Sequence, residues 1–122
     1  MTDLKDIRDR ARAFAEDRDW DKFHSPKNLA MALSGEVGEL LELFQWLTEE
    51  QSRNLTPEQQ HKAAHEIADV QLYLVRLADK LGVDIHAAVT EKMSINEHRY
   101  PADIVRGSSQ KYTAYQKDAD KK

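Results

Sequence analysis

The sequence predicts an all-α fold in a single domain, on three observations. The 122-residue chain contains only four Gly and three Pro, and it is rich in Ala, Leu, Glu, Lys and Gln, which favour helices over strands and tight turns. No segment alternates apolar and polar residues with the period of two that a half-buried strand shows. The apolar content of 40% is enough for one core and leaves little for a second domain.

Capping signals divide the chain into four expected helices. The candidate N-terminal caps are Thr2 or Asp3, Ser25, Thr56 and Asp84, two of which are followed directly by proline. Gly82 is a typical C-terminal signal, and Pro101 should end the last helix. The expected helices cover residues 2–19, 25–47, 56–81 and 84–100, with a loop or short helical turn at 48–55. Beyond Pro101 we expect an extended segment and then a disordered charged tail at 114–122.

Two acidic pairs place charge beside apolar residues. Glu36 and Glu39 lie three residues apart on the second helix, as do Glu66 and Asp69 on the third, so each pair shares one side of its helix. The adjoining apolar stripes, of which we expect the second to be core, are Leu29, Leu33, Val37, Leu40, Phe44 and Ile67, Val70, Leu74, Ala78, Leu81. A carboxylate withdrawn from water is costly unless a cation neutralises it. Four such carboxylates would suit a hard divalent cation such as Mg²⁺, and the alternative is two ordinary ion-paired helix faces.

Gly35 and Gly38 flank these glutamates inside the same expected helix. A glycine in a helix interior costs about 1 kcal/mol relative to alanine. Their presence indicates that a ligand or a neighbouring backbone approaches closely, or that two helices pack tightly there.

The inward-facing residues of the fourth helix change from apolar to polar along its length. Its core-facing stripe begins with apolar residues and continues, on the same line, through Lys92, Asn96 and Arg99. These side chains would contact phosphate oxygens well. The alternative is a helix end that emerges into solvent.

Several other kinds of protein are disfavoured. The absence of cysteine excludes a disulfide framework and a cysteine-based zinc site, and the charged N-terminus has no apolar signal core, so we expect a cytoplasmic protein. No apolar stretch approaches the length of a membrane span, and the net charge of −4 argues against binding nucleic-acid polymers. His61 and His65 have the spacing of a zinc pair but lack the glutamate of the zincin motif, so we expect them on the surface.

The paired motif Glu36-x-x-Glu39 and Glu66-x-x-Asp69, followed downstream by Arg99-Tyr100-Pro101, resembles the MazG-like all-α nucleotide pyrophosphohydrolases. Shorter motifs are similar to the dCTP pyrophosphatase branch of that family: Arg18-Asp19-Trp20, Phe23-His24-x-Pro26-x-Asn28-Leu29, Gly35-Glu36-Val37-Gly38-Glu39-Leu40, Phe44-Gln45-Trp46, Lys92-Met93 and Arg106-Gly107-Ser108. The resemblance covers about residues 4–113, so we expect a MazG-like domain at 1–113.

This resemblance implies a four-helix MazG-like bundle completed by oligomerisation. It implies Mg²⁺-dependent hydrolysis, with Mn²⁺ as the alternative ion, of dCTP or a related modified dNTP to the monophosphate and pyrophosphate, in nucleotide-pool sanitation. The implied catalytic and metal-binding residues are Glu36, Glu39, Glu66 and Asp69. The implied substrate-binding residues are Trp20, His24, Trp46, Tyr73, Lys92, Asn96 and Arg99.

Two features bear on the base pocket. Trp46 follows Glu39 by seven residues, about two helical turns, so we expect its indole on nearly the same side of the helix as the carboxylate. The dCTP pyrophosphatase branch has a histidine that faces the base where this chain has Ala11. Which base is preferred therefore stays open.

Two alternatives to this function remain. The chain would otherwise be a non-catalytic helical oligomerisation module with structural cation sites, or a pyrophosphohydrolase for a different nucleoside triphosphate. Apolar residues on more than one face of at least two helices predict a homo-oligomer. The family resemblance favours a homotetramer built as a dimer of dimers, with a dimer as second choice.

Overall fold

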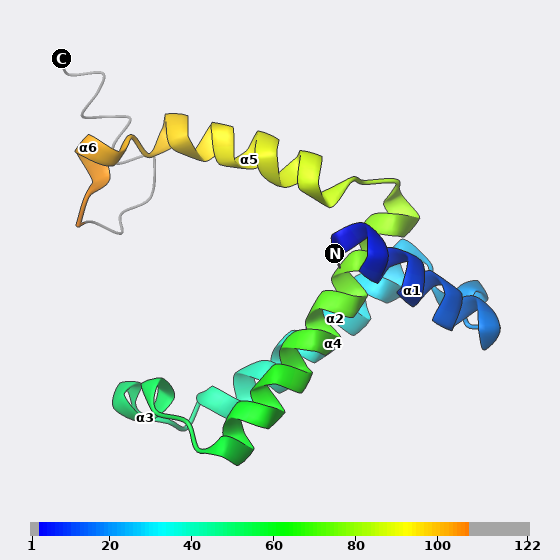
Figure 1. Cartoon of the computed structure of the whole chain (residues 1–122), viewed down its shortest axis with the longest axis horizontal. Helices are drawn as coiled ribbons and strands as arrows, with labels where there is room; N and C mark the ends of the chain where they lie inside the picture. Colours follow the sequence, from blue (N-terminus) through cyan, green and yellow to red (C-terminus); the bar gives the residue numbers. More distant parts are fainter. Residues whose placement is uncertain (1–2, 108–122) are drawn as a thin grey trace. The chain divides into compact units, whose positions relative to one another are not determined.

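The structure, a computed structural model, describes residues 3–107 and is helical, with no strand in that range. The all-α class predicted from the sequence is confirmed. The elements are α1 (Leu4–Asp17), the short 3₁₀ helix η1 (Asp21–Phe23), α2 (Pro26–Phe44), α3 (Glu49–Arg53), α4 (Pro57–Leu81), α5 (Ile85–Arg99) and α6 (Ala102–Val105) (Figure 1). They form two compact units that divide between Asp84 and Ile85, so α1 to α4 belong to one unit and α5 and α6 to the other.

Side-chain caps fix where the helices of the first unit begin. The backbone N–H of Asp6 donates to Asp3, and α2 and α4 are capped in the same way by Ser25 and Thr56, as predicted. Thr56 also forms a reciprocal capping box with Gln59, which satisfies two backbone donors at once. The third expected helix ends as predicted, because Gly82 adopts the left-handed conformation with φ 66°.

Two predicted boundaries are wrong. The second helix ends at Phe44 rather than near Leu47, because the chain turns there, with the Leu47 N–H donating to the Phe44 carbonyl. Thr48 then caps α3 with a second capping box, so local hydrogen bonding favours a new short helix over extension of α2. The segment after Pro101 is not all extended, since the one-turn helix α6 occupies part of it. The predicted tail at 114–122 lies outside the described residues.

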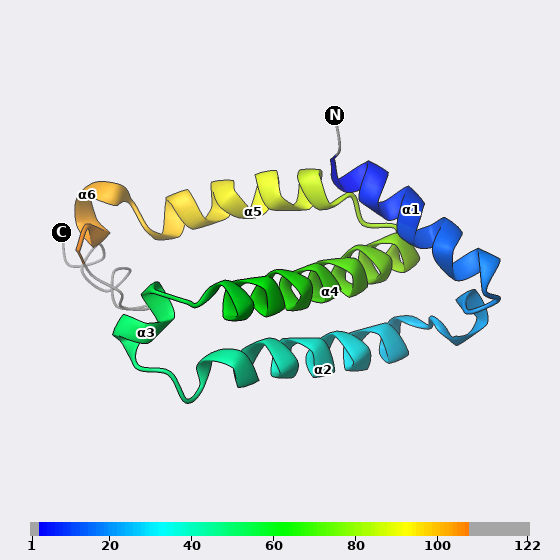
Figure 2. The ribbon, with the colours of Figure 1, turned by 60° about the horizontal axis from the view of Figure 1, so that its bottom comes forward.

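The first unit is organised around the packing of α2 against α4. These two helices run antiparallel and side by side, connected through α3, and α1 packs against the C-terminal half of α4 (Figure 2). Leu29 of α2 and Val75 of α4 are each only 1% exposed, and Ala15 of α1 is also buried. This arrangement gives α4 two helical neighbours and places its acidic pair opposite that of α2.

The predicted apolar stripe of α4 is only partly a core stripe. Ala78 is buried, but Ile67, Leu74 and Leu81 are exposed, because no described element of the first unit covers that face. The prediction that this stripe is core is therefore confirmed for Ala78 but not for Ile67, Leu74 and Leu81 in the described single chain. Among the described residues, no helix is both long and apolar enough to cross a membrane.

Candidate metal and nucleotide site

The packing of α2 on α4 brings three predicted carboxylates together. Glu36, Glu39 and Glu66 each offer one carboxylate oxygen, and these three oxygens lie within 4.8 Å of one another. We call these residues, together with the adjacent Asp69, the acidic cluster. The spacing of the acidic pairs along each helix produces this convergence, because each pair lies on the side of its helix that meets the other helix.

The acidic cluster contains carboxylate oxygens that the described chain leaves unsatisfied. One oxygen of Glu36 and one of Glu66, Oε2 in both, are buried and have no hydrogen-bond partner in the described part of the chain. Glu39, in contrast, is exposed. A buried acceptor without a donor is unfavourable and rare in folded proteins, so each such oxygen calls for an explanation.

The pKa values of two carboxylates in the acidic cluster also indicate that a cation would be favourable there. Burial raises the pKa of Glu36, and the negative charge of Glu39 raises it further. The pKa of Glu66 is raised for the same two reasons, in the same order. Asp69 adds to both shifts, which places its charge close to the cluster. Neighbouring carboxylates and burial are the causes of both shifts within the part of the chain that the structure describes, and four such carboxylates form a donor set that fits a hard divalent metal ion.

Gly35 and Gly38, the glycines beside the glutamates, are not closely packed by other atoms of the described chain. A Cβ added to Gly35 or to Gly38 would meet no atom within 4 Å. Among residues 3–107, no other helix packs tightly against these glycines, and packing against a second copy of the chain is not tested. Close approach of a ligand stays a prediction.

A cleft of about 640 Å³ lies between α1, the connector after it, and α4. Its lining includes Asp69 of the acidic cluster together with Trp20, His24 and Tyr73, three of the residues predicted to bind substrate. Ala11 also lines it. These three side chains thus share one cavity with one of the predicted metal ligands.

Trp46 is placed differently. It lies in the turn after α2, with its side chain 85% exposed, and it is not part of the cleft lining. The expectation that it sits two helical turns beyond Glu39 on the same helix is wrong, because α2 ends before it. Its assignment to the base pocket stays a prediction.

The three residues predicted to contact phosphate all lie on α5, in the second unit. Lys92 is exposed and Asn96 is half-buried. Their approach to the acidic cluster, and that of Arg99, stays a prediction. His61 and His65 are exposed on α4, as predicted, and their rings lie 4.3 Å apart between centroids.

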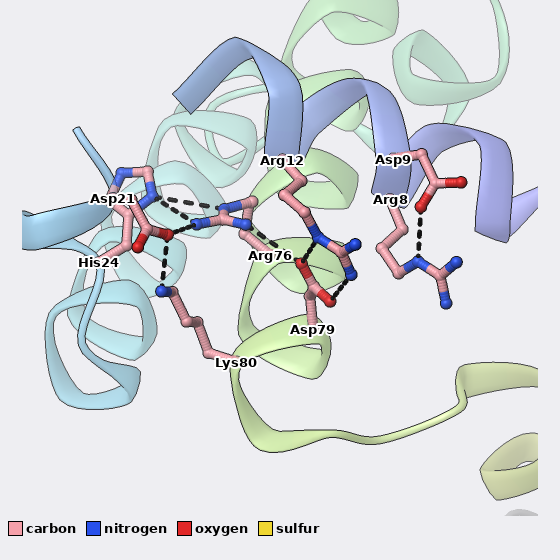
Figure 3. Close-up of polar contacts among 8 residues, drawn as sticks. All are labelled: Arg8, Asp9, Arg12, Asp21, His24, Arg76, Asp79 and Lys80. Atoms are coloured by element: carbon pink, nitrogen blue, oxygen red, sulfur yellow. Dashed lines mark hydrogen bonds and ion pairs between the residues drawn. The ribbon is translucent and has the colours of Figure 1, made fainter. Parts of the chain in front are cut away.

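Beside the cleft lies an ion-pair network that was not predicted from the sequence. Its centre is Arg76, which is only 4% exposed and whose guanidinium donates to Asp21 at 2.8 Å and to Asp79 at 3.2 Å (Figure 3). Lys80 pairs with Asp21 at 2.6 Å, and Arg12 of α1 donates to Asp79 at 2.9 Å. We call these five residues the Arg76 network.

One sequence signal points to this network. Arg76 continues the line of α4 that contains Asp69 and Tyr73, and Asp79 follows it by three residues, a spacing that permits an ion pair on one face. The partners from other elements could not be identified this way, since Asp21 lies 55 residues away along the chain.

The two carboxylates of the Arg76 network have pKa shifts opposite to those of Glu36 and Glu66. Hydrogen bonds from Lys80 and then from Arg76 lower the pKa of Asp21. A hydrogen bond from Arg12 is the main cause of the lowered pKa of Asp79. Both carboxylates are therefore held ionised by cations of this chain.

Comparison with known proteins places the chain in a family. The sequence pattern of the MazG-like family matches residues 31–114. The chain is 49% identical to human dCTP pyrophosphatase 1 over 112 residues and 48% identical to the mouse protein of that name, each match covering 90% of this chain and 66% of the relative. The chain thus spans just under two thirds of the length of these curated relatives.

A solved structure supports the same relationship. The crystal structure of a pyrophosphatase from Archaeoglobus fulgidus superposes on this chain with a TM-score of 0.77 at 38% sequence identity, covering 83% of this chain and 94% of that one. The helical fold, the convergent acidic pairs and the match over most of the chain agree. The chain belongs to the MazG-like family.

Proposed function

We propose that this chain is a Mg²⁺-dependent nucleoside triphosphate pyrophosphohydrolase that converts dCTP, or a related modified dNTP, to the monophosphate and pyrophosphate. The observation that carries the proposal is the pair of buried, unpartnered carboxylate oxygens on Glu36 and Glu66, which converge with Glu39. The similarity to proteins named dCTP pyrophosphatase supports the substrate, and nucleotide-pool sanitation would be the cellular role.

The acidic cluster would hold the metal ion. Glu36, Glu39, Glu66 and Asp69 supply acceptor-only oxygens from two helices, a set that also permits Mn²⁺. When bound, Mg²⁺ would neutralise phosphate charge and polarise the phosphoryl oxygens. Ionised carboxylates would otherwise repel a triphosphate, which explains why the same residues cannot bind the substrate alone.

One carboxylate of the cluster would also act as general base. Hydrolysis adds water across the phosphoanhydride bond between the α- and β-phosphates, so the attacking water must lose a proton to an acceptor. Beside the metal ion, the acceptors that the structure offers are the carboxylate oxygens of the acidic cluster. The proton released from the water would pass to such an oxygen while the bond to the pyrophosphate group breaks.

The cleft would hold the nucleoside. Its volume of about 640 Å³ lies within the range of small-ligand pockets, and its lining offers aromatic surface from Trp20 and Tyr73 together with the imidazole of His24. In this proposal Lys92, Asn96 and Arg99 of α5 hold the phosphates, and Trp46 contributes to the base pocket.

The same proposal includes a homotetramer built from dimers. Its support is the amount of large apolar side chain left exposed on α2 and α4: Met31, Val37, Leu41, Ile67, Leu72 and Leu74. Scattered exposed apolar residues are ordinary, but two packed helices that both expose them favour association with a second copy. A cytoplasmic location and a domain at 1–113 complete the proposal.

A substrate panel tests the activity. Purified protein would be assayed for pyrophosphate release from the four dNTPs, their ribonucleotide counterparts and 5-modified dCTP, with Mg²⁺, with Mn²⁺ and with EDTA. We expect release from dCTP or a modified dCTP that EDTA abolishes. Metal-dependent release from another nucleotide alone would instead favour the alternative specificity.

Thermal melting separates the enzyme from the structural alternative. A non-hydrolysable dCTP analogue should raise Tm in the presence of millimolar Mg²⁺, because a ligand that binds only the folded state stabilises it by mass action. Stabilisation by Mg²⁺ alone, with no added effect of any nucleotide, would support a structural cation site.

A further inference from the structure

His24 contacts the buried guanidinium of Arg76 through one particular ring nitrogen. Nε and Nη2 of Arg76 lie 3.4 and 3.3 Å from Nδ1 of His24. Figure 3 shows the other ring nitrogen, Nε2, turned away from the guanidinium. The imidazole thus has one nitrogen occupied by the protein and one left for another partner, and His24 lines the cleft.

The chemistry of the guanidinium decides which nitrogen of His24 has the proton. An arginine side chain has only donors and is not deprotonated in proteins. It can therefore hydrogen-bond Nδ1 only if Nδ1 presents its lone pair. In a neutral imidazole the proton must then be on Nε2, which makes that nitrogen a donor.

We propose that Arg76 is a positioning residue that holds His24 in the neutral Nε2–H tautomer and thereby gives the cleft a fixed hydrogen-bond donor for an acceptor atom of the base. This inference rests on the proposed function for the identity of the ligand as a nucleotide. The acceptor would be a ring nitrogen or carbonyl oxygen, such as N3 or O2 of cytosine. A base edge that presents only donors would be disfavoured, because its donor would face another donor.

The other charges around His24 support a neutral ring. The Arg76 network contains three cations, Arg12, Arg76 and Lys80, but only two carboxylates, Asp21 and Asp79, so one positive charge is in excess. Burial lowers the pKa of His24, the charge of Arg76 lowers it further, Asp21 opposes this shift, and Lys80 adds to it. A second proton on the imidazole would both break its contact with Arg76 and increase this excess.

The Arg76 network also holds the guanidinium of Arg76 in the position from which it contacts His24. Arg76 donates hydrogen bonds to Asp21 of η1 and to Asp79 of α4. Lys80 also pairs with Asp21, and Arg12 with Asp79. Holding an arginine by two carboxylates restricts its rotamer, so the direction of its donors toward His24 is set before a ligand arrives.

The tautomer can be measured directly in the free protein. Uniform ¹⁵N-histidine labelling and long-range ¹H–¹⁵N correlation distinguish the two neutral tautomers from their nitrogen shifts. The His24→Gln variant assigns the signal among the five histidines of the chain. We expect a single Nε2–H form for His24 at neutral pH, without metal or nucleotide. A predominant Nδ1–H form, or an equal mixture of the two, would overturn the proposal.

Variants at position 76 test the cause. Arg76→Leu should give a mixture of tautomers and a higher titration midpoint for His24, whereas Arg76→Lys, which keeps a donor-only cation, should largely preserve the Nε2–H form. Arg53→Gln is the matched control, because it removes an exposed arginine that pairs with Glu49 on α3. If Arg76→Leu does not fold, the wild-type tautomer and the lysine variant still decide the question. An unchanged tautomer and midpoint in folded Arg76→Leu would refute a role for Arg76.

Kinetics then test the consequence for the nucleotide. Arg76→Leu and His24→Asn should raise KM for dCTP by up to about ten-fold with a smaller change in kcat, as expected for loss of one hydrogen bond. His24→Gln, whose amide can reach the position of Nε2, should be affected less. Inorganic triphosphate, which has no base, should bind all of them like the wild type. Equal KM values for dCTP in the wild type and in folded His24→Asn would exclude the donor role.

Failure of this inference and failure of the proposed function have different signatures. An enzyme that hydrolyses dCTP normally but shows Nδ1–H at His24 would refute the positioning role alone. A protein that shows the Nε2–H form but hydrolyses no nucleotide would refute the function, and Arg76 would then position a donor for some other ligand.

Discussion

The acidic cluster and the Arg76 network both include charged residues of α4, yet only the network pairs its carboxylates with cations. The network pairs each carboxylate with at least two cations of the chain. In the cluster, Glu36 and Glu66 bury oxygens that have no partner among residues 3–107. The difference indicates two purposes. The network stabilises the fold, while the cluster tolerates an unfavourable state that a ligand would relieve.

The pKa shifts express the same contrast. Neighbouring cations lower the pKa values of Asp21 and Asp79, so folding favours their ionised forms. Burial and neighbouring carboxylates raise the pKa values of Glu36 and Glu66, so folding without metal disfavours their ionised forms. A metal ion would reverse the second effect.

The largest effect is expected at the metal site. Glu39→Gln preserves size and helix propensity but removes a charge from the cluster, so pyrophosphate release from dCTP should fall about a hundred-fold or more. The control is Glu58→Gln, the same change at an exposed glutamate of α4 that pairs with Lys62. Both variants should keep the helical circular-dichroism signal. Near-normal turnover in folded Glu39→Gln would remove this residue from the site.

The next effect concerns stability. Arg76→Leu removes the buried centre of the network, so we expect the free energy of unfolding to fall by about 2–3 kcal/mol in urea denaturation. This is less than for a carboxylate left without any partner, because Asp21 retains Lys80 and Asp79 retains Arg12. Arg53→Gln should change stability by less than about 0.5 kcal/mol, as expected for an exposed pair. Equal effects of the two variants would contradict a central role for Arg76.

The cleft between the two regions gives a third test. Trp20 lines the cleft and is 45% exposed, so its indole surface is available to a base. Base stacking is worth about 1–3 kcal/mol, so Trp20→Ala should raise KM for dCTP by about ten-fold, while the affinity for inorganic triphosphate stays unchanged. Loss of affinity for both ligands would indicate general disruption of the cleft rather than lost stacking.

The smallest effect is on the pH dependence of stability. The pKa values of Glu36 and Glu66 are raised in the folded state. Above the ordinary glutamate pKa of about 4.3, the folded state therefore binds more protons than the unfolded state. Stability of the metal-free protein should therefore fall as pH rises through this window, and the double variant Glu36→Gln/Glu66→Gln should show a weaker dependence. Stabilisation by Mg²⁺ should increase with pH over the same range, because the ligands must be deprotonated.

The network should respond with the opposite sign and at lower pH. The lowered pKa values of Asp21 and Asp79 contribute stability that is present above the ordinary aspartate value of about 3.9 and is lost as pH falls through their folded values. Melting curves of the wild type and Arg76→Leu should therefore converge in acid. A constant difference down to pH 2 would indicate that lost packing, rather than lost ion pairing, destabilises the variant.

Features that depend on neighbours along the chain could be predicted from the sequence. Helix starts at Asp3, Ser25 and Thr56 were predicted correctly, because a cap contacts backbone groups only two or three residues away. The acidic pairs were found for a similar reason, since a spacing of three residues fixes a shared helix face before any tertiary contact forms. The spacing alone could not show that the two pairs converge. They converge because α2 packs against α4.

Features that join distant segments of the chain depend on how the helices pack. Arg76 meets His24 and Asp21 across more than 50 residues of chain, so no local pattern could pair them. The cleft likewise exists only because α1 packs against α4. The end of α2 before Trp46 is instead a local feature that apolar periodicity missed, since Thr48 and Gln51 form a capping box that begins a new helix. Charge spacing along a helix thus fixed which side the carboxylates face, while helix packing decided which charges meet a partner.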